Sequence, residues 1–186
     1  MVRSSARLPF VALTLVLALC AFFIQPVAAQ DATPAAGPIS VIELAPGVTA
    51  EVLAAAPSVR APGQTAYVVR FTFQPGGEIF PHSHPGTTVL GVASGSLGWT
   101  LLEGTAHVVR GAASGATGPT EELTEPGAEV ILEPGDAIFY EDDVVHTARG
   151  AGSEEAVVLG TLLLTAGEPL LMPAAEMAGM AATPTP

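Results

Sequence analysis

The sequence predicts an all-β domain, either a sandwich or a barrel, from the pattern of its apolar residues. In the segment 65–73, TAYVVRFTF, these residues alternate, so that Tyr67, Val69, Phe71 and Phe73 share one face. A period of two residues is typical of a strand with one buried face. Similar short runs recur between turn signals such as PGG, ASGS and EPG, and no long stretch shows the 3.6-residue period of a helix. Short strands with regular turns are typical of sandwiches and barrels.

Residues 1–29 are typical of a secretory signal peptide rather than of a folded domain. Arg3 and Arg7 precede an apolar run from Leu8 to Ile24, and Ala29 is small enough to precede a cleavage site. The alternative is an uncleaved N-terminal anchor. We therefore expect a secreted or extracytoplasmic protein that has no stable membrane span after the signal is cleaved.

The rest of the chain divides into a linker, one β domain and a tail. Residues 30–38 are small and proline-rich, which favours a linker, and residues 173–186 are too poor in large apolar groups to order themselves. The domain covers residues 39–172. Residues 111–123 form a long connection, either a disordered hairpin insertion or a loop near a site. Besides residues 65–73, the expected strands are Ile39–Leu44, Val48–Ala55, Thr87–Ala93, Ser96–Leu102, Ala106–Arg110, Ala128–Leu132, Asp136–Tyr140 and Ala156–Leu164.

The composition excludes several classes of function. The chain carries a formal net charge of −12 and no lysine. Nucleic acids and anionic membranes bind basic patches, so neither is expected as a partner. Schiff-base chemistry needs a lysine amine and is also excluded. The single cysteine, Cys20, lies in the predicted signal, so the mature chain has neither a disulfide nor thiol chemistry.

His82 and His84 are the first candidate metal ligands. They are two residues apart, and side chains at that spacing on an extended segment point to the same side. Pro81 and Pro85 flank the pair and stiffen its backbone. Neutral imidazole is a common ligand of zinc, iron, copper, nickel and manganese. Two histidines in a loop without a metal are the alternative that this spacing alone leaves open.

The wider spacing resembles the two-part signature of the cupin superfamily. Gly76, His82, His84 and Gly95 are in register with the first cupin motif, and Gly135 and His146 match the second. The resemblance implies a double-stranded β-helix, which is a jelly-roll barrel, with a divalent metal ion held by His82, His84 and His146. Three positions of the second motif depart from the cupin pattern, namely Glu141, Asp143 and Gly150.

The main departure is Thr88, which occupies the position of the metal-binding glutamate of cupins. A threonine hydroxyl is a poor ligand beside carboxylate or imidazole. Glu78 is a candidate replacement, because a regular strand would put it on the same face as His82. It would then be a fourth ligand or a catalytic acid/base. The alternative is a solvated turn carboxylate that plays no part in the site.

Two functions follow as expectations from the resemblance. The first is a metal-dependent oxidoreductase, of the dioxygenase type, with an unknown substrate. The second is a non-catalytic extracytoplasmic module that binds a metal or a small molecule. The metal stays open among iron, manganese, zinc, nickel and copper, because three histidines accept most of these ions. Cupins commonly pair through sheet faces, so a homodimer is expected. The fourth histidine, His107, belongs to neither motif and is expected on an exposed strand face.

Overall fold

The computed structural model describes residues 40–111 and 120–174. The predicted signal segment, the linker and residues 175–186 of the predicted tail lie outside the described residues. Within the described ranges, no helix is long and apolar enough to cross a membrane.

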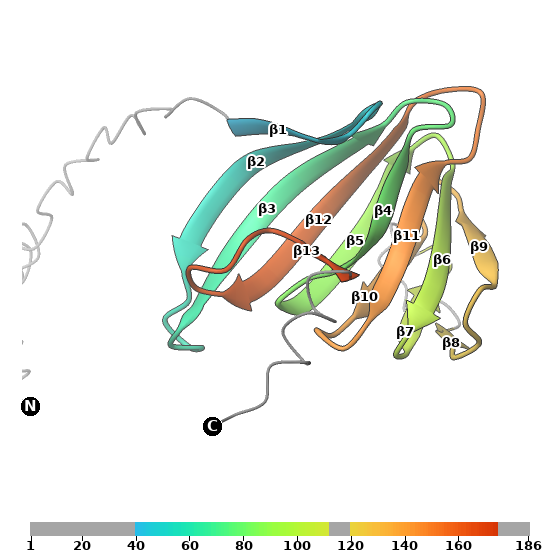
Figure 1. Cartoon of the computed structure of the whole chain (residues 1–186). Coiled ribbons are helices and arrows are strands. Elements are labelled where there is room, and N and C mark those ends of the chain that lie inside the picture. Colours follow the sequence, from blue (N-terminus) through green and yellow to red (C-terminus); the bar gives the residue numbers. More distant parts are fainter. Residues whose placement is uncertain (1–39, 112–119, 175–186) are drawn as a thin grey trace, which may run out of the picture. The chain divides into compact units, whose positions relative to one another are not determined.

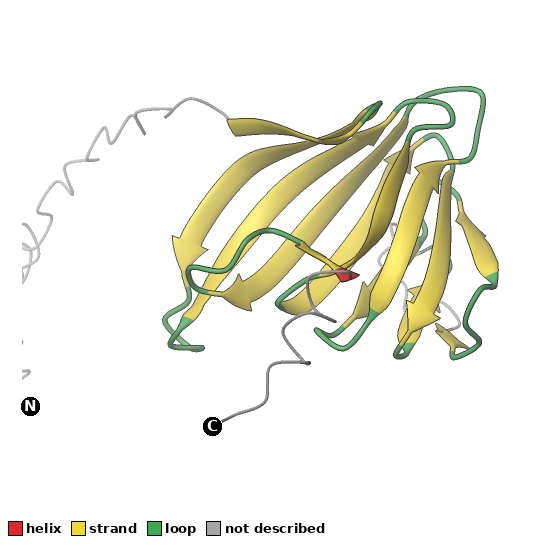
Figure 2. Cartoon of the chain, in the orientation of Figure 1, coloured by secondary structure: helices red, strands yellow, loops and turns green. Residues whose placement is uncertain are grey.

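The described chain is built almost entirely of strands, as Figure 2 shows. In chain order they are β1 (Ser40–Ala45), β2 (Val48–Pro57), β3 (Gln64–Phe73), β4 (Glu78–Ser83), β5 (Gly86–Ser94), β6 (Leu97–Glu103), β7 (Ala106–Val109), β8 (Thr120–Leu123), β9 (Glu129–Leu132), β10 (Ala137–Tyr140), β11 (Val145–Gly150), β12 (Ala156–Thr165) and β13 (Met172–Pro173).

The strands form two antiparallel sheets (Figure 1). The large sheet has the order β1-β2-β3-β12-β5-β10-β7-β8, and the small sheet has the order β13-β4-β11-β6-β9. The central strands β3-β12-β5-β10 and β4-β11-β6-β9 have the strand order of a jelly roll, in which two Greek keys face each other. The predicted double-stranded β-helix is therefore confirmed. Strands β7 and β8 pair as a hairpin inserted between β6 and β9.

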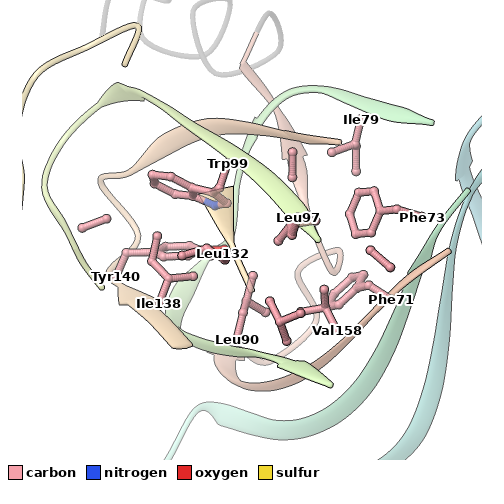
Figure 3. Close-up of a cluster of buried hydrophobic side chains, with 14 of the residues drawn as sticks. Phe71, Phe73, Ile79, Leu90, Leu97, Trp99, Leu132, Ile138, Tyr140 and Val158 are labelled. Atoms are coloured by element: carbon pink, nitrogen blue, oxygen red, sulfur yellow. The ribbon is translucent and has the colours of Figure 1, made fainter. Parts of the chain in front are cut away.

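The core lies between the two sheets, where the inward side chains of both meet (Figure 3). In β3 the expected alternation holds, because Val69, Phe71 and Phe73 are buried while Arg70 is exposed. Trp99 of the small sheet is fully buried in the same core. Burial of such apolar surface, at about 25 cal/mol per Å², is the main force that holds the sheets together.

A carboxylate fastens the β7–β8 hairpin to the turn before β10. Asp136 accepts hydrogen bonds from the Arg110 guanidinium at 2.8 Å, from the Gly111 amide at 3.0 Å and from the Glu133 amide at 3.1 Å. Burial alone would raise the pKa of the Asp136 carboxyl, but these hydrogen bonds outweigh burial and leave the pKa below its ordinary value. Asp136 therefore stays ionised and holds the insertion against the barrel.

Four strands differ from the expectations drawn from sequence. Strands β4 and β11, which carry the candidate ligands, were not among the expected strands. Residues 120–123 of the predicted long connection form β8, while residues 112–119 lie outside the described range. Met172 and Pro173 pair with β4, so ordered structure continues past the predicted start of the tail at residue 173.

Candidate metal centre

Three buried histidines meet inside the barrel. His82 lies on β4 and His84 directly after it, while His146 lies on β11, the neighbouring strand, directly opposite His82. One nitrogen from each ring lies within 4.8 Å of one nitrogen from each of the other two. Their residues are only 3%, 2% and 1% exposed, respectively. The structure therefore brings together all three histidines that the cupin resemblance names as ligands.

A bulge in β4 decides which residues join this cluster. His146 is paired with His82 and Ala148 with Ile79, so β4 carries one residue more than β11 over this stretch. Phe80 and Pro81 are consecutively exposed there. A bulge is a common place for proline in a sheet, because proline has no amide hydrogen to donate.

The bulge places Glu78 outside the cluster. A regular strand would turn Glu78 and His82 to the same side, but the extra residue reverses the alternation and turns Ile79 inward instead. Glu78 is exposed and lies opposite Arg149, whose pKa is raised mainly by its hydrogen bond to Glu129 and least by Glu78. The expectation that Glu78 shares a face with the histidines is therefore corrected.

Backbone carbonyls orient two of the three rings. Nδ1 of His82 lies 2.8 Å from the Phe80 carbonyl oxygen, and Nδ1 of His84 lies 2.7 Å from the Leu170 carbonyl oxygen. A carbonyl only accepts hydrogen bonds, so each Nδ1 must carry the proton. Nε2 of each ring then keeps its lone pair free, which is the tautomer that binds a metal through Nε2.

Burial keeps the three imidazoles neutral. It lowers the pKa of His82 to about 4. Burial, helped by the charge of the neighbouring His82, lowers the pKa of His84 to about 3. The pKa of His146 also lies well below its ordinary value, because burial and the two other histidines disfavour its charged form. Proton competition with a metal ion is therefore weak at neutral pH.

His146 is held by aromatic neighbours. Its ring stacks on Trp99, with ring centroids 4.9 Å apart. The hydroxyl oxygen of Tyr140 lies 3.3 Å from Nε2 of His146. Burial raises the pKa of Tyr140, so the phenol keeps its proton. Spacing in the sequence placed Tyr140 only in the core and not beside a ligand.

Thr88 occupies the inner face of β5 next to Tyr140. The two residues are directly opposite each other in the β5–β10 pair, and Thr88 is fully buried. Its hydroxyl has no hydrogen-bond partner among the described residues. Across residues 40–111 and 120–174, the three histidines form the one group of candidate ligands, and it contains no carboxylate.

A small apolar cavity adjoins the histidines. Its volume is about 20 Å³, which is room for about one water molecule. The three histidines line one part of it. The rest of its wall is apolar and consists of Phe71, Phe73, Ile79, Leu90, Leu97, Ala148 and Val158. Phe71, Phe73 and Val158 can be followed in Figure 3.

The donor set fits a transition metal ion. It consists of three neutral imidazoles, two of them with Nε2 free and fixed by a backbone carbonyl. Zinc, for example, binds imidazole nitrogens at about 2.0–2.1 Å. A site with three protein ligands leaves further coordination positions for small molecules. His107, by contrast, is half-buried on the outer face of the large sheet, where it stacks on Phe139 at 4.7 Å between ring centroids.

No protein-family model matches the chain, and no curated protein matches it significantly. Several solved structures are similar at low identity. KdgF from Halomonas sp. is 18% identical, with a TM-score of 0.44 over 66% of this chain and 86% of that chain. A cupin superfamily protein from Desulfitobacterium hafniense DCB-2 is 17% identical, with a TM-score of 0.40 over 63% and 77%. Oxalate decarboxylase from Lactobacillus farciminis is 15% identical, with a TM-score of 0.46 over 78% of this chain but only 36% of that chain.

Strand order and site together define the class of this protein. It is a double-stranded β-helix with a buried three-histidine cluster that spans two neighbouring strands. Its strand order agrees with the cupin-type double-stranded β-helix that the resemblance in sequence implies.

Proposed function

We propose that this chain is an exported metal-binding protein that holds one divalent transition metal ion on His82, His84 and His146. The observation that carries the proposal is the meeting of three buried, neutral imidazoles within 4.8 Å. Burying three imidazoles side by side costs solvation of their polar nitrogens, and a metal ion would use the lone pairs that point into the cluster. Iron, manganese, zinc, nickel and copper all suit this donor set.

The activity that this site supports best is a metal-dependent oxidation of the dioxygenase type, acting on a small substrate. A redox-active ion such as iron(II) would supply the oxygen chemistry. The chain itself contributes orientation, because the Phe80 and Leu170 carbonyls fix two of the rings. The Tyr140 hydroxyl supplies a hydrogen-bond donor beside His146, and the apolar wall of the cavity excludes bulk water.

A second candidate function is a non-catalytic metal-binding or small-molecule-binding module. The size of the cavity favours it, because about 20 Å³ admits little more than one water molecule. In addition, the ligand cluster among the described residues contains no carboxylate to act as an acid or base. The two candidates share the metal site and differ in turnover.

Metal content is the test of the shared site. The full chain is expected to bind close to one equivalent of metal, while His82→Ala and His146→Ala lose it. His107→Ala is the matched control, since it removes a histidine from the outer face and should keep the metal. Equal metal content in all four proteins would rule out the site.

Oxygen uptake separates the two candidates. The iron-loaded protein is assayed with a panel of enediols, catechols and thiols, and the dioxygenase proposal expects uptake that His82→Ala abolishes. If no compound of the panel causes oxygen uptake, the binding module remains as the function.

The export proposal is checked separately. The protein recovered outside the cytoplasm should have the mass of a chain that begins at Gln30.

A further inference from the structure

The segment that follows β12 is bound to the histidine cluster by its backbone. Residues 166–173, called the C-terminal strap below, leave the end of β12, turn and return to β4 (Figure 1). Thr165, just before the strap, donates its amide hydrogen to the Pro85 carbonyl at 2.9 Å. The strap therefore begins next to the residue that follows His84.

Two further contacts fix the strap over the ligands. Met172 and Pro173 pair with Ser83 and His82, so β13 extends the small sheet directly along the ligand strand. Leu170 and Leu171 are half-buried and pack against the hydrophobic core. The strap thus buries apolar surface of its own, which favours its docked state.

The strap also completes the surroundings of a ligand. The Leu170 carbonyl accepts the Nδ1 proton of His84 at 2.7 Å and so sets which nitrogen of that ring is free. Nothing on β4 itself supplies this acceptor, whereas His82 obtains its own from Phe80 on the same strand. His84 is therefore the ligand whose tautomer depends on a distant part of the chain.

We propose that Leu170 is a positioning residue of the metal site and that docking of the C-terminal strap and metal binding are coupled. The inference rests on the proposed metal site. With the strap docked, His84 presents Nε2 to the ion. Without it, either nitrogen carries the proton, and the ring is free to turn. Coupling between two binding events is reciprocal, so a bound ion stabilises the docked strap by the same factor.

A pair of truncations tests the coupling. A chain that ends at Gly167 lacks Leu170 and β13, while a chain that ends at Ala174 keeps both and serves as the matched control. Zn²⁺ affinity is measured by competition with a chromophoric chelator. The chain ending at Ala174 should match the full chain, and the chain ending at Gly167 should bind 10–100-fold more weakly, as expected when the hydrogen-bond partner of a ligand is lost.

Two controls show that the effect comes from the backbone carbonyl. Leu170→Val keeps the carbonyl and should keep the affinity of the full chain. Nitrogen-15 spectra of the imidazoles should show a single Nδ1-protonated tautomer for His84 in the full chain and a mixture in the chain ending at Gly167. A purely structural role of the strap would not change this tautomer.

A measurement on the full chain covers the case in which the shorter chain does not fold. Amide hydrogen exchange of Leu170, Leu171 and Met172 is followed with and without Zn²⁺, and the ion should slow it by 10-fold or more. Unchanged exchange in a protein that binds Zn²⁺, or equal affinity in the two truncated chains, overturns the coupling alone. Failure of the full chain to bind Zn²⁺ overturns the metal site and the coupling with it.

Discussion

At the scale of single residues, His146 differs from its two partners in what holds its ring. His82 and His84 are held by backbone carbonyls, whereas Nε2 of His146 faces the hydroxyl of Tyr140. An ion that takes Nε2 must displace this hydrogen bond. With Nε2 bound to an ion, the phenol would be available to donate a hydrogen bond to a small molecule.

Tyr140→Phe should therefore act differently on the two forms of the protein. It leaves a buried nitrogen unpaired in the metal-free form, which costs about 1–3 kcal/mol of stability. It costs little in the metal-bound form, where the ion uses that nitrogen. Thermal unfolding with and without Zn²⁺ measures both effects, and the affinity for Zn²⁺ should rise by roughly fivefold or more, since about 1 kcal/mol corresponds to that factor.

Thr88→Val is the control for Tyr140→Phe. It removes the neighbouring hydroxyl, which has no partner among the described residues, and should leave the Zn²⁺ affinity unchanged. A Tyr140→Phe protein that is destabilised equally with and without Zn²⁺ would show that the phenol has only a packing role.

The ligands could be predicted from sequence, but their supporting groups could not. Spacing along an extended segment puts His82 and His84 on one side, and the resemblance to the cupin motifs implied His146. Leu170 acts through a backbone carbonyl, which every residue possesses, so no residue type marks it. Tyr140 looks the same in sequence whether its hydroxyl contacts a ligand or only fills the core.

At the scale of elements, the bulge in β4 explains the failed expectation for Glu78. Alternation along β3 or β12 correctly predicts which side chains face the core, because the register of the β3–β12 pair contains no bulge. In β4 the extra residue near Pro81 reverses the faces, and the short segment EIFPHS shows no period that would reveal it. Strand β11 was missed for a related reason, since an acidic run precedes it and its apolar positions are few.

The hairpin of β7 and β8 depends on Asp136. Asp136→Asn should lower the free energy of unfolding by about 1–3 kcal/mol, because it weakens hydrogen bonds from Arg110 and from two amides in a nearly buried place. Denaturant unfolding at pH 7 measures the loss. Glu121→Gln is the control, since Glu121 meets the same guanidinium at 3.4 Å on an exposed surface and should cost less than about 0.5 kcal/mol.

The loss of unfolding free energy in Asp136→Asn depends on pH, and the sign of this dependence follows from the pKa of Asp136. The pKa of Asp136 is lowered by folding, so its contribution is present above the pKa of the unfolded chain, near 3.9, and disappears as the pH falls through the folded value. The difference between wild type and Asp136→Asn should be constant from pH 7 to about 5 and should shrink below pH 4. A difference that grows on acidification would contradict the assigned role.

At the scale of the whole molecule, the three histidines predict acid sensitivity of the metal-free protein. The unfolded chain takes up protons below about pH 6.5, whereas the pKa of folded His82 is about 4. The unfolded state therefore binds more protons, and stability falls as the pH drops from 6.5 toward 4. The His82 shift alone corresponds to roughly 3 kcal/mol, at about 1.4 kcal/mol per pKa unit.

Denaturant unfolding in the presence of a chelator at several pH values between 7.5 and 4.5 checks this prediction. His84→Gln should flatten the profile, because the glutamine does not titrate, while His107→Gln should leave it unchanged. Stability that stays constant down to pH 4.5 would show that the histidines are not buried in their neutral form.

The outer face of the large sheet bears on the expected homodimer. Val68, Val89, Phe139 and Leu159 are 37–45% exposed there, and Phe139 is directly paired with Val89. Val89→Glu should convert a dimer into a monomer in light scattering without changing metal content, because a buried charge at a two-fold contact costs several kcal/mol. Ile131→Glu, on the small sheet, is the control. If Val89→Glu and Ile131→Glu both keep the molar mass of the wild-type protein, this face is not the dimer contact.

The pairing of His82 with His146 has a consequence for rates. These residues are far apart in the chain, so the ligand set exists only after β4 and β11 have come together, and long-range pairing of this kind is slow. An ion that bridges them would bind only after the barrel has folded and would hold β4 and β11 together. It should slow unfolding while leaving the folding rate unchanged, which stopped-flow measurements with and without Zn²⁺ can show. The lifetime of the bound ion would then be set by how rarely the barrel opens.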